Sequence, residues 1–209
     1  MRVLASQDIQ TSMSIKRGSN MTDAYATESI IEQVESLLKS KTGGIHSSIR
    51  GNYGAYLNQI NLSYSLFALD LSKLTGAAFL RLYKTSLYLV HMNNGSKTEN
   101  EDLYNKAIRK YADLTSDAVW VDSKLRGRGI ATWMYNIAHD FTDRGLASTD
   151  NLGTMSVGMW CSLARKHREI FLLRDDGERV DADFSGAIPV VDGKPITRVS
   201  SGYRFIWPK

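Results

Sequence analysis

The chain of 209 residues is poor in cysteine and proline and has no long apolar run. Its single cysteine, Cys161, excludes an internal disulfide, so no covalent cross-link of that kind is expected. No run of about 18 apolar residues occurs, and no apolar stretch follows the first charges of the chain. The sequence therefore predicts neither a transmembrane helix nor a secretory signal, and it favours a cytoplasmic protein.

Histidine and excess charge are also scarce. The four histidines, His46, His91, His139 and His167, have no metal-ligand spacing, so no metal site is predicted. Lysine and arginine number 26 against 22 aspartates and glutamates, which leaves a net charge of +4. That excess is too small to indicate nucleic-acid binding by itself, although it leaves a nucleic-acid partner open.

What the chain does have is enough apolar sequence for a core. Hydrophobic residues make up 43% and charged residues 23%, as in soluble globular proteins. We expect one domain over residues 22–209, preceded by an arm or first strand over residues 1–21. The first clear element of that domain is an amphipathic helix over 28–41, which Ser29 and Glu32 begin as a capping box.

The stretch from Asp117 to Phe141 carries the strongest pattern. Ala118–Val121 is a short apolar run that predicts a buried strand. A glycine-containing basic segment follows, and a helix is expected to start at Ile130. The apolar positions that form one face of this helix are Ile130, Met134, Ile137, Ala138 and Phe141. The sequence thus predicts a strand, a tight turn and a helix in succession.

The turn between this strand and helix combines Gly127 and Gly129 with the cations Lys124, Arg126 and Arg128. The N–H groups at the start of a helix have no intrahelical partners and carry partial positive charge. The turn therefore predicts a site for phosphate or pyrophosphate. A basic loop without a ligand is the alternative, and the Gly-x-Gly spacing alone does not decide between the two.

The motif Arg126-x-x-Gly129-x-Ala131, between an apolar strand and an amphipathic helix, resembles the Arg/Gln-x-x-Gly-x-Gly/Ala signature of the GNAT superfamily of N-acetyltransferases. The resemblance implies that acetyl-coenzyme A binds here, with its pyrophosphate on the backbone of the turn and its pantetheine arm beside the strand. The cofactor-binding residues that it assigns are Val121, Arg126, Gly127, Arg128, Gly129, Ala131 and Thr132.

A short strand and a helix follow, over Leu146–Asn151 and Thr154–Lys166. The basic residues 165–168 lie at the C-terminal end of that helix, where they would complement its dipole. The side chains expected to face the core are Met155, Met159, Trp160 and Leu163. This segment resembles the second motif of the GNAT superfamily, in which the strand diverges from its neighbour to admit the thioester.

Many acetyltransferases of the superfamily carry a tyrosine on this helix as general acid, and here Trp160 has the corresponding place. An indole N–H is not a proton acid, so proton handling falls to Asp150, Tyr135, Ser162 or ordered water. Asp150 is the first choice, with the capping of a turn as its alternative role. Cys161 is expected to be a packed helix residue rather than a nucleophile. The strand that ends in Asp150, with Trp160 ten residues later, is also similar to phage-encoded GNAT-like proteins, some of which resemble DNA-modifying members.

The remaining apolar segments predict further strands. Residues 61–92 fit both strand and helix periodicity, and strands are favoured because side chains alternate over 87–92. A charged helix over 99–111 leads into the strand at Ala118. Strands joined by hairpins are expected over 170–173, 188–191 and 203–207.

We therefore expect an α/β (α+β) protein with a mixed, mostly antiparallel sheet flanked by helices and, by the GNAT resemblance, a V-shaped cofactor cleft between the strands at Asp117 and Leu146. The same resemblance implies direct transfer of an acetyl group from acetyl-coenzyme A to an amine acceptor on a protein, a small molecule or a nucleic acid. Two other functions remain in view: a phage-type nucleic-acid modification protein of GNAT-like fold, and a binding or inhibitor module without turnover. The sequence leaves the acceptor and the oligomeric state open.

Overall fold

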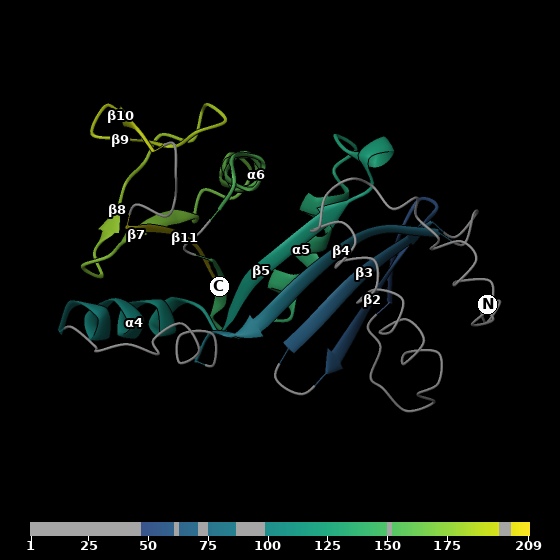
Figure 1. The fold of residues 1–209 in the computed structure, drawn as a ribbon, viewed down its shortest axis with the longest axis horizontal. Helices are drawn as coiled ribbons and strands as arrows, with labels where there is room; N and C mark the ends of the chain where they lie inside the picture. The colour runs from purple at the N-terminus through teal and green to yellow at the C-terminus, as the bar shows by residue number, and fades with distance from the viewer. Residues whose placement is uncertain (1–46, 61–62, 71–74, 87–98, 150–151, 197–201) are drawn as a thin grey trace. The chain divides into compact units, whose positions relative to one another are not determined.

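The structure, a computed structural model, describes residues 47–60, 63–70, 75–86, 99–149, 152–196 and 202–209 (Figure 1). The chain divides into two compact units. The first unit holds the residues up to Arg81 together with Ala118–Met134, and the second unit holds Leu82–Asp117 together with Tyr135–Lys209. The helix expected over 28–41 and the arm over 1–21 lie outside the described residues. The single domain expected over 22–209 stays a prediction.

The first unit contains a meander of antiparallel strands (Figure 1). β1 (Ser47–Arg50) and β2 (Tyr53–Ile60) form a hairpin in which Arg50 pairs with Tyr53 across a two-residue turn. Gly51 has a φ of 57° in this turn, a conformation that glycine adopts without a steric penalty. The sequence did not predict these strands, because small and polar residues interrupt the alternation of β2.

β2 pairs with β3 (Ser63–Asp70), and β4 (Thr75–Lys84) is the next strand in the sheet order. These strands confirm the preference for strands over helices within 61–92, whereas residues 87–92 themselves lie outside the described part. Phe67 and Phe79 are at most 2% exposed, and their ring centres are 5.5 Å apart. Their contact gives the strands of the first unit a common apolar core.

The second unit contains strands of its own, beginning with the part of β5 (Leu114–Val121) that precedes Ala118. β5 pairs in parallel with β6, and the pairs β6–β11, β11–β7 and β7–β8 are antiparallel. The bounds of these strands are Gly145–Ser148 for β6, Phe171–Arg174 for β7, Arg179–Val180 for β8 and Tyr203–Pro208 for β11. The strands expected over 170–173 and 203–207 are thus confirmed to within a residue.

A separate two-stranded sheet is formed by β9 (Val190–Val191) and β10 (Lys194–Pro195). The sequence predicted a longer strand over 188–191, and only its last two residues are extended. The turn between β9 and β10 places Asp192 and Gly193 at positive φ angles of 49° and 73°. Asp and Gly tolerate that conformation better than other residues, which suits them to a turn of only two residues.

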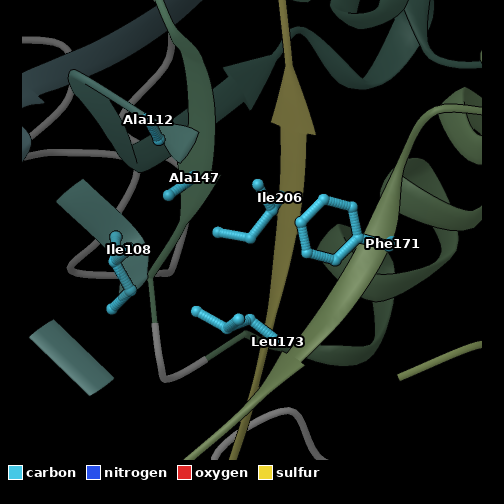
Figure 2. Close-up of a cluster of buried hydrophobic side chains, with 6 residues drawn as sticks. All are labelled: Ile108, Ala112, Ala147, Phe171, Leu173 and Ile206. Carbon is cyan, nitrogen blue, oxygen red and sulfur yellow. The ribbon is translucent and has the colours of Figure 1, made fainter. Parts of the chain in front are cut away.

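α4 (Glu99–Tyr111) confirms the charged helix expected at this position and packs against β6 and β11 of the second unit. Tyr111 lies edge-on to Phe171, with ring centres 5.1 Å apart. Figure 2 shows the side chains that meet here, each at most 2% exposed: Ile108, Ala112, Ala147, Phe171, Leu173 and Ile206. Full burial stabilises a large apolar side chain by about 1.5–3 kcal/mol, so this cluster fixes α4 on the sheet.

Besides α4, the described residues form two α-helices of more than two residues. They are α5 (Ile130–Asp140) and α6 (Thr154–Ala164). Together with α4 they flank a mixed, mostly antiparallel sheet, which is the α+β class that the sequence predicts. In the described part of the chain, no helix has both the length and the apolar composition needed to cross a membrane.

The ends of α5 and α6 differ from prediction. α5 ends at Asp140, so Phe141, predicted on the buried face, is 39% exposed. Met155, predicted to face the core, lies in the first turn of α6 and is 76% exposed. Apolar periodicity shows which positions share a helix face, but not how far the neighbouring elements cover that face.

The basic residues 165–168 lie at the C-terminal end of α6 as expected, although the helix ends at Ala164 and not at Lys166. Arg165 is the C-cap residue, and its guanidinium Nη1 donates to the carbonyl oxygens of Phe184 at 2.9 Å and Gly186 at 2.6 Å. The guanidinium of Arg165 therefore holds a loop, a role that the sequence did not predict.

Trp207 lies between two histidines of the second unit. Its indole is 1% exposed, and its ring centre lies 4.1 Å from that of His139 and 4.4 Å from that of His167. Trp207 Nε1 donates to Glu169 Oε1 at 3.0 Å, and His139 Nε2 donates to the carbonyl oxygen of Pro208 at 3.0 Å. These contacts tie the C-terminal strand to α5.

We expect His139 to make stability fall as the pH drops below about 6.5, the ordinary pKa of a histidine. Burial lowers the pKa of His139, and the hydrogen bond to Pro208 and the nearby carboxylates offset this only in part. The unfolded chain therefore binds more protons than the folded chain in this pH range, and the free energy of unfolding decreases. His139→Gln should flatten the decrease, measured as urea midpoints between about pH 5 and pH 8.

The urea midpoints are measured only above about pH 5, because Glu169 changes its protonation state at lower pH and would add its own effect on stability. Burial alone would raise the pKa of Glu169, but hydrogen bonds from its own backbone and from Trp207, with the nearby histidines, lower it overall. Its stabilisation is therefore lost only as the pH falls below its ordinary value of 4.5. Parallel curves for the two proteins between about pH 5 and pH 8 would show that His139 does not cause the decrease.

Candidate functional site

The turn that joins β5 to α5 belongs to the first unit. Asp122 begins it by accepting a hydrogen bond at 2.8 Å from the N–H of Lys124, within the 3-10 turn η1 (Ser123–Leu125). Gly127 and Gly129 follow at φ angles of 77° and 74°, which side chains other than glycine rarely adopt. The predicted strand, tight turn and helix are confirmed, and the turn depends on both glycines.

The start of α5 presents backbone donors at this turn. The N–H of Trp133 donates to the carbonyl oxygen of Gly129 at 3.0 Å, which closes the first helical turn. The N–H groups of residues 130–132 precede that bond and have no carbonyl partner within the helix. No described atom lies within 4 Å of the position that a Cβ on Gly127 would occupy, so the backbone there is open to a ligand.

Arg50 brings a further cation to the turn from β1, 79 residues earlier in the chain. Its Nη1 donates to the carbonyl oxygen of Gly129 at 2.8 Å. A Cβ on Gly129 would lie 3.3 Å from both Nη1 and Nη2 of Arg50, so only a glycine leaves this guanidinium undisturbed. Sequence reasoning missed Arg50, because nothing in the local pattern of 47–50 points to a residue so distant.

The cations predicted from the sequence are exposed around the same turn. Lys124, Arg126 and Arg128 are all exposed, and Arg126 Nε donates to the carbonyl oxygen of Val121 at 3.1 Å. Val121 itself is half-buried, as are the predicted residues that open the helix, Ala131 and Thr132. The predicted cofactor-binding residues thus lie at the end of β5, in the turn and in the first turn of α5, and this stretch combines N–H donors and guanidinium groups suited to an oxyanion.

Tyr135 and Trp160, by contrast, lie in the core of the second unit. Tyr135 is 2% exposed, and its ring centre is 5.3 Å from that of Trp160 in an edge-on contact. Burial raises the pKa of Tyr135, the charge of Asp117 adds to this, and a hydrogen bond with the Ser116 side chain opposes it. The phenol therefore holds its proton more tightly than a free tyrosine.

Trp160 is fully buried, and its Nε1 has no hydrogen-bond partner among the described residues. Such an unpaired donor costs about 1–3 kcal/mol of stability. The indole also stacks on Phe205, with ring centres 5.5 Å apart. Its two aromatic contacts, with Tyr135 and Phe205, make Trp160 a packing residue in this structure.

The other candidates for proton transfer are less well defined. Ser162 is half-buried on α6, and Asp150 lies outside the described residues. Cys161 is fully buried, which confirms the prediction of a packed helix residue, and burial raises its pKa to about 11. A thiol with that pKa stays protonated near neutral pH and is a poor nucleophile.

The parallel strands β5 and β6 pair over a short distance. Their register runs from Leu114 opposite Leu146 to Ser116 opposite Ser148, where β6 ends. β5 continues to Val121. The V-shaped cleft expected at these strands stays a prediction.

We also looked for a metal-binding group near these residues and for similar proteins. Among the described residues, no group of three or more His, Cys, Asp or Glu side chains is placed to hold a metal ion. Comparison of the chain with protein-family models, with curated proteins and with solved structures found no match.

Proposed function

We propose that the protein is an acyl-coenzyme A-dependent N-acyltransferase that transfers an acetyl group from acetyl-coenzyme A to an amine. The observation that carries the proposal is the turn between β5 and α5. Gly127 and Gly129 take positive φ angles there, and exposed arginines lie beside the first N–H groups of the helix. The GNAT-like motif in the sequence and the parallel pair β5–β6 support the same reading.

The residues of this turn fit the pyrophosphate of the coenzyme. The N–H groups of residues 130–132 and the open backbone at Gly127 would hold its oxygens. Arg126, Arg128 and Arg50 would offset its charge. When bound, acetyl-coenzyme A supplies a thioester carbonyl at which the amine forms an N–C bond as the C–S bond breaks.

The protein then has to accept a proton from the attacking amine and to stabilise or protonate the leaving thiolate. Asp150 is our first candidate for the base, with Tyr135 and Ser162 as the other candidates. The raised pKa of Tyr135 and its burial make it the weakest of the three for accepting or giving a proton at neutral pH. The acceptor amine can belong to a protein, a small molecule or a nucleic acid.

A coenzyme-binding module without turnover is the second candidate. It is favoured by the full burial of Trp160 at the place where acetyltransferases that the sequence resembles carry a catalytic tyrosine. An indole donor is not a proton acid, so this position offers no replacement for the tyrosine. Both candidates require coenzyme binding at the same turn, and they differ only in whether transfer follows.

We expect acetyl-coenzyme A to raise the melting temperature of the intact protein. At a ligand concentration about 100 times the Kd, the stabilisation is about 2.7 kcal/mol, which corresponds to roughly 5–10 °C for a chain of this size. Gly129→Leu should remove most of this shift, because its side chain would displace Arg50 and block the approach of a phosphate to the backbone. Differential scanning fluorimetry measures both values.

The matched control is Gly193→Leu, since Gly193 has nearly the same φ angle, 73° against 74°, and no atom within 4 Å of a Cβ. It imposes the same backbone strain at a turn outside the proposed site and should keep the full shift. No shift with millimolar acetyl-coenzyme A in the unaltered protein would reject both candidate functions. Mass spectrometry of any nucleotide that co-purifies gives an independent test of coenzyme binding.

A further inference from the structure

A cavity lies in the second unit, away from the residues of the turn before α5. Its volume is about 430 Å³, within the range of small-molecule sites. The segment after α6, the β7–β8 hairpin and the loop over 181–185 form its walls. The polar side chains that line it are Arg165, Arg168, Arg179, Asp181 and Ser185.

The charge in this pocket is mainly positive. Of its charged lining residues, Asp181 alone is acidic. Arg168 and Arg179 form no ion pair or hydrogen bond with the described residues, so none of these residues neutralises either cation. Unpaired guanidinium groups gathered in one concave surface attract an anion more strongly than the same groups spread over a convex surface.

The walls of the pocket are held in place before any ligand binds. Arg165 Nη1 fixes the loop through the carbonyl oxygens of Phe184 and Gly186. Asp183 holds the same loop by accepting from Ser185 N–H at 2.8 Å and from Ser185 Oγ at 3.0 Å. A site arranged in advance loses little conformational entropy when it binds a ligand.

Arg179 is also fixed in orientation. Its guanidinium carbon lies 4.5 Å from the centre of the Phe171 ring, so one face of the guanidinium is covered by the ring. Its N–H donors lie in the plane of the group, and none of them forms a hydrogen bond with a described residue. Phe184, half-buried, also lines the pocket and offers an apolar surface.

We propose that this pocket binds a phosphate group, either as the free ion or as part of a small organic phosphate, through Arg168 and Arg179. Planar guanidinium groups match the oxygens of a phosphate with paired hydrogen bonds. The negative charge of Asp181, which also lines the pocket, repels the phosphate and lowers its affinity. The proposal does not depend on coenzyme binding, because none of these residues belongs to the turn before α5.

The test is isothermal titration calorimetry of the full chain with inorganic phosphate and with adenosine 5′-monophosphate. Arg168→Gln and Arg179→Gln should each weaken binding roughly 10- to 100-fold, as expected for loss of a charged hydrogen bond. The matched control is Lys166→Gln, which removes an exposed charge of the same segment that does not line the pocket and should change affinity roughly twofold or less. Asp181→Asn should strengthen binding.

The same titrations in Gly129→Leu separate this pocket from the turn before α5. Phosphate binding that survives Gly129→Leu and is weakened by Arg168→Gln supports the proposal, whichever of the two ligands binds more tightly. Binding that is lost in Gly129→Leu but kept in Arg168→Gln assigns the phosphate to the turn and overturns it. The proposal is also overturned if Arg168→Gln and Lys166→Gln weaken binding equally. It is likewise overturned if the protein binds a single-stranded oligonucleotide but neither of the two small phosphates.

Discussion

Gly145→Ala is expected to destabilise the protein by about 2–6 kcal/mol, a large part of the 5–15 kcal/mol that holds a typical domain folded. Gly145 has a φ of 135° and is the first residue of β6. A Cβ built there would collide with the carbonyl oxygen of Trp207, and would come within 2.7 Å of Pro208 Cα and 2.8 Å of the Tyr111 carbonyl oxygen. All of these are backbone atoms, so no side-chain rotation relieves the clash.

The magnitude combines backbone strain of about 1–3 kcal/mol with overpacking of about 1–3 kcal/mol. Gly145 sits where the end of α4 meets β6 and β11, and Gly145 lies opposite Pro208 in the antiparallel ladder. The side chain of Asp113 also accepts from the N–H of Gly145 at 3.4 Å. A shift of the backbone at this point therefore disturbs the helix and both strands.

Urea unfolding followed by circular dichroism measures this loss, and Gly158→Ala is the matched control. Gly158 lies inside α6, and a Cβ there meets only the Ala187 carbonyl oxygen at an ordinary distance of 3.7 Å. Alanine is favoured over glycine within a helix by about 0.8–1 kcal/mol, so this control should stabilise the protein. A loss below about 1 kcal/mol for Gly145→Ala would contradict the close packing at Gly145.

Gly145 also illustrates what sequence alone could not predict. A glycine shortly after a helical stretch usually indicates the end of the helix, but α5 already ends at Asp140 and Gly145 begins the next strand. A glycine marks a special backbone conformation without identifying its cause. Here the cause is the approach of the Trp207 and Tyr111 carbonyl groups, which lie 62 and 34 residues away in sequence.

The elements that were predicted correctly have strong local patterns. The helix over 99–111 and the turn between β5 and α5 depend on periodicity, glycine and short-range charge, all of which lie within a few residues of one another. β1 and β2 lack such a pattern and were missed. The exposed Met155 shows the opposite error, since its periodicity is correct but no neighbouring element covers it.

The candidate site divides in the same way. The backbone turn could be predicted because its motif is continuous from Arg126 to Ala131. The bond from Arg50 to Gly129 and the packing of Trp160 between Tyr135 and Phe205 could not, because they join distant segments. Long-range contacts of this kind follow from tertiary packing rather than from any local sequence signal.

Asp150→Asn is expected to lower the rate of acetyl transfer roughly 10²–10⁴-fold while leaving the thermal shift with acetyl-coenzyme A nearly unchanged. Asp150 follows β6, whose last residue, Ser148, is fully buried. Ser148 Oγ accepts from the N–H of Phe205 at 3.1 Å and donates to the carbonyl oxygen of Thr149 at 2.9 Å. These two hydrogen bonds hold Ser148 and Thr149 in place.

Asn keeps the size and hydrogen-bonding capacity of Asp but does not accept a proton from an amine at neutral pH. It also caps turns and helices about as well as Asp. A near-normal rate in Asp150→Asn would therefore mean that Asp150 is only a cap, and would move the chemistry to Ser162, Tyr135 or water. Asp143→Asn removes an exposed carboxylate elsewhere in the second unit and should leave the rate unchanged.

The unaltered protein decides between the enzyme and the module without turnover, provided that coenzyme binding is measured in the same samples. Binding without transfer to proteins, small amines or nucleic acid would favour the module, because the turn before α5 then works while no group handles the proton. Transfer that Asp150→Asn abolishes would instead show that the chain supplies its own base. It would also show that catalysis does not need a tyrosine at position 160, since Trp160 is buried and offers no proton acid.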